Sequence, residues 1–197
     1  MKSAEEFLES ADLPTKKAAY SAPVKSSGEQ RRKAEALGAA AAYVNKVGLN
    51  NVTSGKLRTQ LLEKKYDEDL VESVITELCE SGYLNDYERA LSLLSARRGH
   101  RAEGKAALRR RLHRLGVESN AAAAALAELA TSEEERALEF ILSKRSRDVV
   151  ELRLLEDDRK AYYKLRNKIL AAVCRRGFSP GVAVEALTLA LQQVADD

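Results

Sequence analysis

The sequence predicts an all-helical protein in which tandem three-helix repeats, three units in all, form an elongated and curved array. Strong helix formers such as Ala, Leu, Glu, Arg and Lys are abundant, and a hydrophobic content of 45% is enough for a buried core. Ten glycines and three prolines leave little room for a sheet with many tight turns. No strand-like alternation of apolar and polar residues persists. The sequence also contains an internal repeat, which divides the chain into the three predicted units.

The first segment, residues 1–28, differs from the rest of the chain and is expected to be a mobile tail. Two prolines and five serines interrupt it, and its apolar residues follow no sustained period. It lacks the apolar core of a secretory signal peptide, and no part of the chain approaches 18 consecutive apolar residues. We therefore expect a cytoplasmic protein with no membrane span.

From about Glu29 onward the apolar residues recur with the period of a helix, and the chain carries signals for helix ends. Asp67 precedes an apolar-periodic run, and Ser179 places a capping hydroxyl before Pro180 at a first helical position. Gly82 follows a helical run, where a helix C-terminus uses glycine. Breaks between helices are expected at 48–55, 82, 99–104, 116 and 177–180.

Three windows of the chain align on Tyr66, Val117 and Phe178. Apolar residues recur nine and five positions before each anchor and four, five, eight, nine and twelve positions after it, which describes two helical stripes meeting at a turn. An earlier helix also recurs, so each unit is helix–helix–helix, and stacked units would share apolar faces. The predicted units are 29–81, 82–131 and 132–197. The third unit has 14 additional residues between its first two helices, which predicts a long solvated helix.

The sequence contains no recognisable catalytic site. Cys79 and Cys174 stand among apolar neighbours, so we expect buried free thiols and neither a disulfide nor a zinc site. His100 and His113 lack metal-ligand spacing with Cys, Asp or Glu and are expected at the surface. No nucleotide-binding or nucleophile motif occurs. We therefore expect a protein that is not an enzyme and has no cofactor or metal.

Charge is sorted by helix, although the net charge is only +3. The second helix of each unit is basic. In the middle unit Leu108 and Leu112 define the inner face, and this directs Arg110, Arg111 and Arg114 into solvent. Arginine suits bidentate contact with carboxylate or phosphate groups. The candidate partner-binding cations of this basic face are Arg97, Arg98, Arg101, Lys105, Arg109, Arg110, Arg111, Arg114, Arg166, Lys168, Arg175 and Arg176.

Two segments carry a resemblance to a known family. Gly82-Tyr83-Leu84-Asn85-Asp86-Tyr87-Glu88-Arg89-Ala90 follows a Val- and Leu-rich helix, and Arg175-Arg176-Gly177-Phe178-Ser179 stands near the C-terminus. A basic segment bounded by glycines lies between them. In this order and at this spacing the chain resembles the RecX family, bacterial regulators of the RecA recombinase, over about residues 30–192.

The resemblance implies tandem three-helix repeats that bind RecA and lie in the groove of its filament on single-stranded DNA. Members of the family modulate filament growth and strand exchange, usually by inhibition, without being enzymes; this belongs to DNA repair, DNA recombination and the SOS response. We expect a monomer. Asn85 and Asp86 of the family motif would form a contact or cap the following helix, and we favour Asp86 as the N-cap.

The residues themselves leave alternatives open. The basic face could meet an acidic surface of RecA, DNA phosphates, or both. An independent DNA-binding helical module is the main alternative function. A structural adaptor for another acidic protein would use the same sorting of charge. The cations would otherwise form a solvated face, on which Arg114, Arg175 and Arg176 complement helix C-termini.

Overall fold

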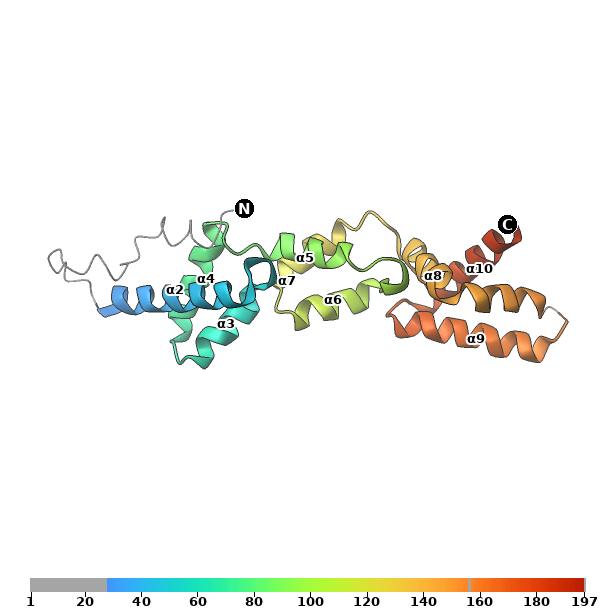
Figure 1. Ribbon diagram of the computed structural model, residues 1–197, viewed down its shortest axis with the longest axis horizontal. Helices are drawn as coiled ribbons and strands as arrows, with labels where there is room; N and C mark the ends of the chain where they lie inside the picture. The colour runs from blue at the N-terminus through green and yellow to red at the C-terminus, as the bar shows by residue number, and fades with distance from the viewer. Residues whose placement is uncertain (1–27, 156, 197) are drawn as a thin grey trace. The chain divides into compact units, whose positions relative to one another are not determined.

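The all-helical prediction is confirmed. A computed structural model describes residues 28–155 and 157–196, and these residues contain nine α-helices, two short 3-10 helices and no strand (Figure 1). The predicted tail, apart from Gly28, lies outside the described residues. The elements are α2 (Gly28–Val47), η1 (Leu49–Asn51), α3 (Ser54–Glu63), α4 (Glu68–Glu80), α5 (Asp86–Ser95), η2 (Gly99–Arg101), α6 (Lys105–Arg114), α7 (Ser119–Ala127), α8 (Glu133–Leu154), α9 (Arg159–Arg175) and α10 (Pro180–Asp196).

The chain divides into two compact units. The first unit comprises the described residues up to Arg89 together with Leu115–Glu118, and the second comprises Ala90–Arg114 and the described residues from Ser119 onward. In the first unit α2, α3 and α4 pack together (Figure 1). Their shared core is formed by the apolar faces of the three helices, including Leu57, Leu61 and Leu78.

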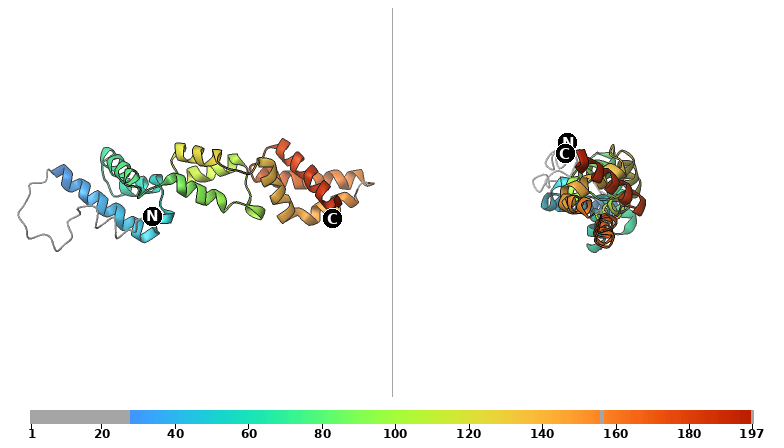
Figure 2. Two further views of the ribbon diagram at one scale, coloured as in Figure 1. Left: turned by 90° about the horizontal axis from the view of Figure 1, so that it is seen from above. Right: turned by 90° about the vertical axis from the view of Figure 1, so that its right-hand side faces the viewer.

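In the second unit α8, α9 and α10 surround the main apolar core, and α10 lies across α8 and α9 (Figure 2). The predicted long helix corresponds to α8, with 22 residues, and the neighbouring α9 has 17. The added length is not solvated on all sides, because Val149 and Leu152 in the distal half of α8 are completely buried. A capping box begins α8: the Ser132 hydroxyl accepts from the Glu135 N–H, and the Glu135 carboxylate accepts from the Ser132 N–H.

Most positions of the predicted apolar stripes are buried. Those with at most 6% exposure are Leu57, Leu61, Val71, Val74, Ile75, Leu78, Leu108, Leu112, Ala122, Ala125, Leu126, Ile169, Val173, Ala183, Ala186, Leu187 and Ala190. The description of three units as copies of one repeat stays a prediction, as do its boundaries.

The turn before each anchor residue has the same backbone conformation. Gly116 and Gly177 have φ of +74° and +83°, and Lys65 at the equivalent place has φ of +66°. The Lys65 and Tyr66 N–H groups donate to the Leu62 and Leu61 carbonyls, which closes the end of α3. A side chain in this left-handed conformation is strained, so Lys65 does what glycine does more easily.

The predicted helix ends at Ser179 and Gly82 are confirmed. The Ser179 hydroxyl accepts from the Val182 N–H at 3.2 Å, and Gly82, with φ of +71°, follows the C-terminus of α4. Asp67 occupies the N-cap position of α4, although its side chain makes no capping hydrogen bond there.

The prediction of buried thiols is wrong for Cys79, which is exposed, and Cys174 is only half-buried. Both are free, as predicted. Within residues 28–155 and 157–196, no helix combines the length and the apolar character that a bilayer crossing requires.

Candidate partner-binding surface

The helix α6 presents the densest cationic surface of the described chain. Leu108 and Leu112 are each 1% exposed and fix the inner face of the helix. Lys105, Arg109, Arg110, His113 and Arg114 are therefore exposed, and α6 contains no acidic residue. No acidic residue within α6 itself offsets the charge of its cations.

An open hollow of about 600 Å³ lies against this side of α6 and is lined by Arg109, Arg110, His113 and Arg114. No hydrogen bond or ion pair joins these four side chains to another part of the described chain. We call these four residues the α6 cation cluster. Clustered cations of one sign attract polyanions over a distance, and guanidinium groups bind carboxylates or phosphates in a bidentate manner.

Close backbone contact fixes the start of α6. The Gly104 N–H donates to the Arg176 carbonyl at 3.0 Å. A Cβ at Gly104 would overlap the carbonyl oxygen of Gly177. Only glycine fits there, so the direction of α6 depends on this contact.

Arg111 does not point into solvent, which corrects the helical-wheel prediction. Its Nε donates to Glu103 Oε2 at 2.9 Å and its Nη2 donates to Glu103 Oε1 at 2.7 Å. Glu103 is buried, with a side chain only 7% exposed, and the arginine folds back along α6 to reach it. Arg111 therefore belongs to the internal packing of the second unit and not to the exposed cluster.

Arg176 is also engaged inside the second unit. Its Nη2 donates to the His100 carbonyl at 2.5 Å, its guanidinium lies 5.0 Å from the centre of the Phe140 ring, and Nη1 lies 3.9 Å from Glu103 Oε1. The Arg176 side chain keeps 32% exposure despite these contacts, and its place on the partner-binding face stays a prediction.

The Glu103 carboxylate interacts with the charges of three arginines, Arg97, Arg111 and Arg176. Burial acts to raise its pKa, but hydrogen bonds from Arg111 and the charges of Arg111, Arg97 and Arg176 outweigh burial, so the pKa lies below its ordinary value. The hydrogen bond to Glu103 raises the pKa of Arg111 in turn. Glu103 is therefore held ionised in the folded protein.

Sequence reasoning missed Arg136, which has the largest fully buried side chain among the residues that the structure describes, at 1% exposure. Its guanidinium donates to the carbonyls of Arg97 at 2.8 Å and Glu103 at 3.2 Å. Burial lowers its pKa. The sequence does indicate this burial, because Arg136 stands four residues before Phe140 and therefore lies on the apolar side of α8. A solvated arginine would lie on the opposite side of the helix.

Asp86 is not the helix cap, because Asn85 performs that role: its Oδ1 accepts from the Glu88 N–H at 3.1 Å. Asp86 is the first residue of α5 and belongs to the first unit, as do Ser54 and Glu118. Its Oδ1 accepts from the Ser54 N–H at 2.9 Å. Its Oδ2 accepts from the Ser54 hydroxyl at 2.6 Å and from the Glu118 N–H at 2.6 Å. The segment 82–90 thus supplies a structural carboxylate that ties three chain segments together.

The other predicted cations differ in their surroundings. Arg98, Arg101 and Arg175 are exposed, whereas Arg97 and Arg166 are half-buried. Lys168 is exposed but lies 3.3 Å from Asp148. The expectation that the basic helices of all three predicted units share one side stays a prediction. Among the described residues no group of three or more His, Cys, Asp or Glu side chains is placed to hold a metal ion.

The fold and this surface define an all-helical protein whose exposed chemistry is a cluster of cationic side chains suited to an anionic partner. No protein-family model matches the chain. Regulatory protein RecX of Mycobacterium ulcerans (strain Agy99) is 30% identical over 145 residues, which cover 73% of this chain and 79% of that protein. Regulatory protein RecX of Mycobacterium sp. (strain JLS) is 29% identical over 140 residues, or 71% and 74% of the two chains.

The crystal structure of RecX from Lactobacillus salivarius has the same fold, with a TM-score of 0.60 at 18% identity over 83% of this chain and 99% of that chain. The chain belongs to the RecX family of regulatory proteins, as the sequence motifs indicated.

Proposed function

We propose that this chain is a non-enzymatic regulator that binds the RecA recombinase and its filament on single-stranded DNA, and that it inhibits filament growth, ATP hydrolysis and strand exchange. Membership of the RecX family supports this proposal. The single structural observation that carries it is the α6 cation cluster, whose four side chains are exposed and have no acidic partner in the described chain.

In this mechanism the cation cluster docks on an anionic feature of the filament, and the helical scaffold covers the surface that the next RecA subunit needs. No chemical step on the chain is required, because occupancy alone impedes polymerisation. Each guanidinium group can bind two oxygen atoms of one carboxylate or phosphate, which gives the contact more geometric specificity than a lysine point charge. We propose that the chain acts as a monomer in the cytoplasm, in DNA repair, recombination and the SOS response.

The test is a titration of this protein into RecA on single-stranded DNA while ATP hydrolysis is followed. We expect hydrolysis to fall as the protein approaches the concentration of RecA. Hydrolysis that stays constant at a large excess of this protein would contradict the proposal. A rise in hydrolysis would retain RecA as the partner and reverse the direction of regulation.

A second candidate function is favoured by the same cluster: direct binding of DNA phosphates without RecA. Four clustered cationic groups would release counterions on binding, so the affinity for DNA would fall steeply with salt concentration. Fluorescence anisotropy of labelled single-stranded DNA at several salt concentrations measures this. Absence of binding at low salt removes this candidate and leaves RecA as the partner.

A further inference from the structure

The outward face of α8 differs from that of an ordinary solvated helix. Val149 and Leu152 are completely buried on its inner side. The opposite side carries Ser143, Arg147, Val150 and Leu154, which fall within about 60° of one another at 100° per residue. Val150 is 46% exposed and Leu154 is 81% exposed. Polar residues are expected along the outermost line of a helix that faces only water.

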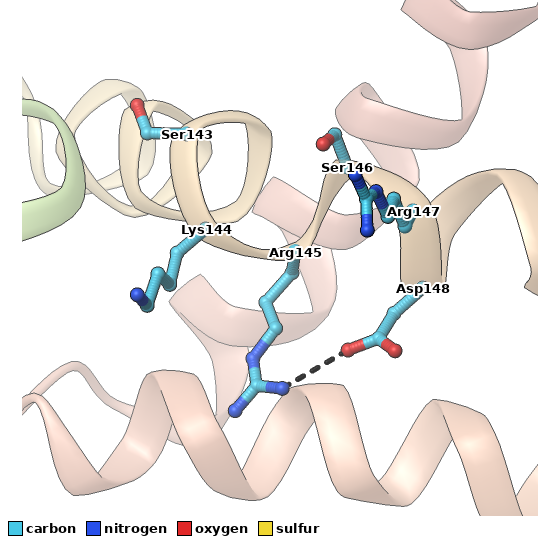
Figure 3. A pocket seen from close by; sticks show the side chains of 6 residues that line it. All are labelled: Ser143, Lys144, Arg145, Ser146, Arg147 and Asp148. Atoms are coloured by element: carbon cyan, nitrogen blue, oxygen red, sulfur yellow. Dashed lines mark hydrogen bonds and ion pairs between the residues drawn. The ribbon is translucent and has the colours of Figure 1, made fainter.

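A polar hollow of about 390 Å³ lies beside the first part of this face and is lined by Ser143, Lys144, Arg145, Ser146, Arg147 and Asp148 (Figure 3). Its one carboxylate is already used, because Arg145 Nη1 lies 3.1 Å from Asp148 Oδ2 and Lys168 Nζ lies 3.3 Å from Asp148 Oδ1. In Figure 3 Arg145 reaches toward Asp148, whereas Ser146 and Arg147 lie on the other side of the helix. The hollow therefore retains cationic charge and two hydroxyl groups.

Lys144 and Arg147 have no ion pair or hydrogen bond with another side chain in the described part of the chain, and both are exposed. Arg145 Nε is buried and has no hydrogen-bond acceptor. Arg153 adds a further exposed cation beside Leu154, and Glu151 is the acid on this side. The face thus combines a cationic hollow with two exposed apolar side chains, Val150 and Leu154, about two helical turns farther along α8.

We propose that the outward face of α8, defined by Ser143, Arg147, Val150 and Leu154, docks a protein segment that carries carboxylates next to apolar side chains. Under the proposed function, on which this inference rests, that segment belongs to RecA. A carboxylate of the partner binds Arg147 at the hollow, and an apolar side chain of the partner covers Val150 and Leu154.

The exposed apolar side chains of Val150 and Leu154 favour a protein over a nucleic acid as the occupant. A phosphodiester backbone would satisfy Arg147 and Lys144, but it offers no apolar group to Leu154. The face has no aromatic side chain on which an unpaired base could stack. Apolar contact flanked by charge is typical of a protein interface, in which a few well-covered side chains supply most of the affinity.

The experiment measures the affinity of immobilised full-length protein for RecA without DNA, and separately for single-stranded DNA without RecA. Two variants remove the two parts of the face: Val150→Gln with Leu154→Gln, and Arg147→Glu. Matched controls make the same changes elsewhere in the second unit: Val184→Gln with Leu189→Gln on α10, where the exposed fractions are 40% and 37%, and Lys160→Glu in the first turn of α9.

We expect each face variant to bind RecA about 10-fold more weakly and the controls to stay within about two-fold of the parent. All changed residues are exposed, so thermal unfolding followed by circular dichroism should be unaltered. RecA binding that is equal in the parent and the face variants overturns this inference alone. If the face variants lose DNA binding but keep RecA binding, the face is a nucleic-acid surface, and this result also overturns the inference. A parent protein that does not bind RecA overturns the proposed function together with this inference.

Discussion

Arg111 and Glu103 form a two-pronged ion pair, in which Nε and Nη2 of the arginine lie 2.9 and 2.7 Å from the two carboxylate oxygens. The glutamate precedes α6 and the arginine stands in its last turn, so the pair holds the helix against the chain that leads into it. Arg176 approaches the same carboxylate at 3.9 Å, which links α9 to this point. The pair therefore supports the helix that carries the cation cluster.

Replacing Glu103 by Gln should destabilise the second unit by about 1–3 kcal/mol, because it leaves Arg111 partly buried without its counter-charge. Urea denaturation at pH 7 measures the loss. Arg111→Gln should cost at least as much, since it leaves the Glu103 carboxylate, whose side chain is 7% exposed against 28% for Arg111, without its hydrogen-bonded counter-charge. Equal stability of Glu103→Gln and the parent protein would show that the pair contributes nothing.

The lowered pKa of Glu103 also predicts how stability depends on pH. The carboxylate is more acidic in the folded chain than in the unfolded chain, where its pKa is about 4.3. Its contribution is therefore fully present above that value and is lost as the pH falls through the folded-state pKa. Between pH 7 and pH 3 the parent should lose more unfolding free energy than Glu103→Gln. Identical pH profiles for the two proteins would contradict this.

Replacing Asp86 by Asn should destabilise the first unit by about 1–3 kcal/mol. The carboxylate accepts three hydrogen bonds from Ser54 and Glu118, and an amide has one acceptor oxygen and presents N–H groups to donors. Chemical denaturation measures the effect. Ser54→Ala, which removes only the hydroxyl, is the matched comparison and should cost less. If Asp86→Asn loses less unfolding free energy than Ser54→Ala, the N–H groups of Ser54 and Glu118 do not depend on the carboxylate.

Much of the fold follows from sequence because apolar periodicity and helix-end signals are local. Leu57, Leu108 and Ile169 were placed on inner helix faces by spacing, and each is buried. Ser179 and Gly82 act at helix ends because their chemistry needs only neighbouring backbone groups.

The ion pairs within the site could not be predicted in the same way. A helical wheel gives the direction of a Cβ atom but not the path of a long side chain, and Arg111 bends back to a carboxylate eight residues earlier. The sequence favours Asp86 as a cap because local sequence says nothing of Ser54, which lies 32 residues away. Contacts between distant segments decide which charges stay exposed.

Replacing Lys65 by Gly should stabilise the first unit by about 0.5–1 kcal/mol. The lysine has φ of +66°, a conformation that costs a residue with a side chain about 1–2 kcal/mol. Removing this strain stabilises the folded unit by more than the added flexibility of glycine stabilises the unfolded chain. Thermal unfolding detects the change as a higher Tm. Lys64→Gly is the control, since Lys64 has φ of −79° and glycine there only adds flexibility. Stabilisation by Lys64→Gly, or its absence for Lys65→Gly, would argue against strain at this turn.

Reversing the charge of the α6 cation cluster should separate regulation from folding. We expect Arg109→Glu, Arg110→Glu and Arg114→Glu together to weaken inhibition of RecA-dependent ATP hydrolysis at least about 10-fold, because three exposed cations become anions. Arg111 is left unchanged, since its ion pair with Glu103 would make any loss structural. The matched control reverses Arg159, Lys160 and Lys164, three exposed cations of α9, and should inhibit like the parent. Both triple variants should unfold at nearly the parent temperature. Equal loss of inhibition in the two would mean that net charge, and not the position of the cluster on α6, controls the effect.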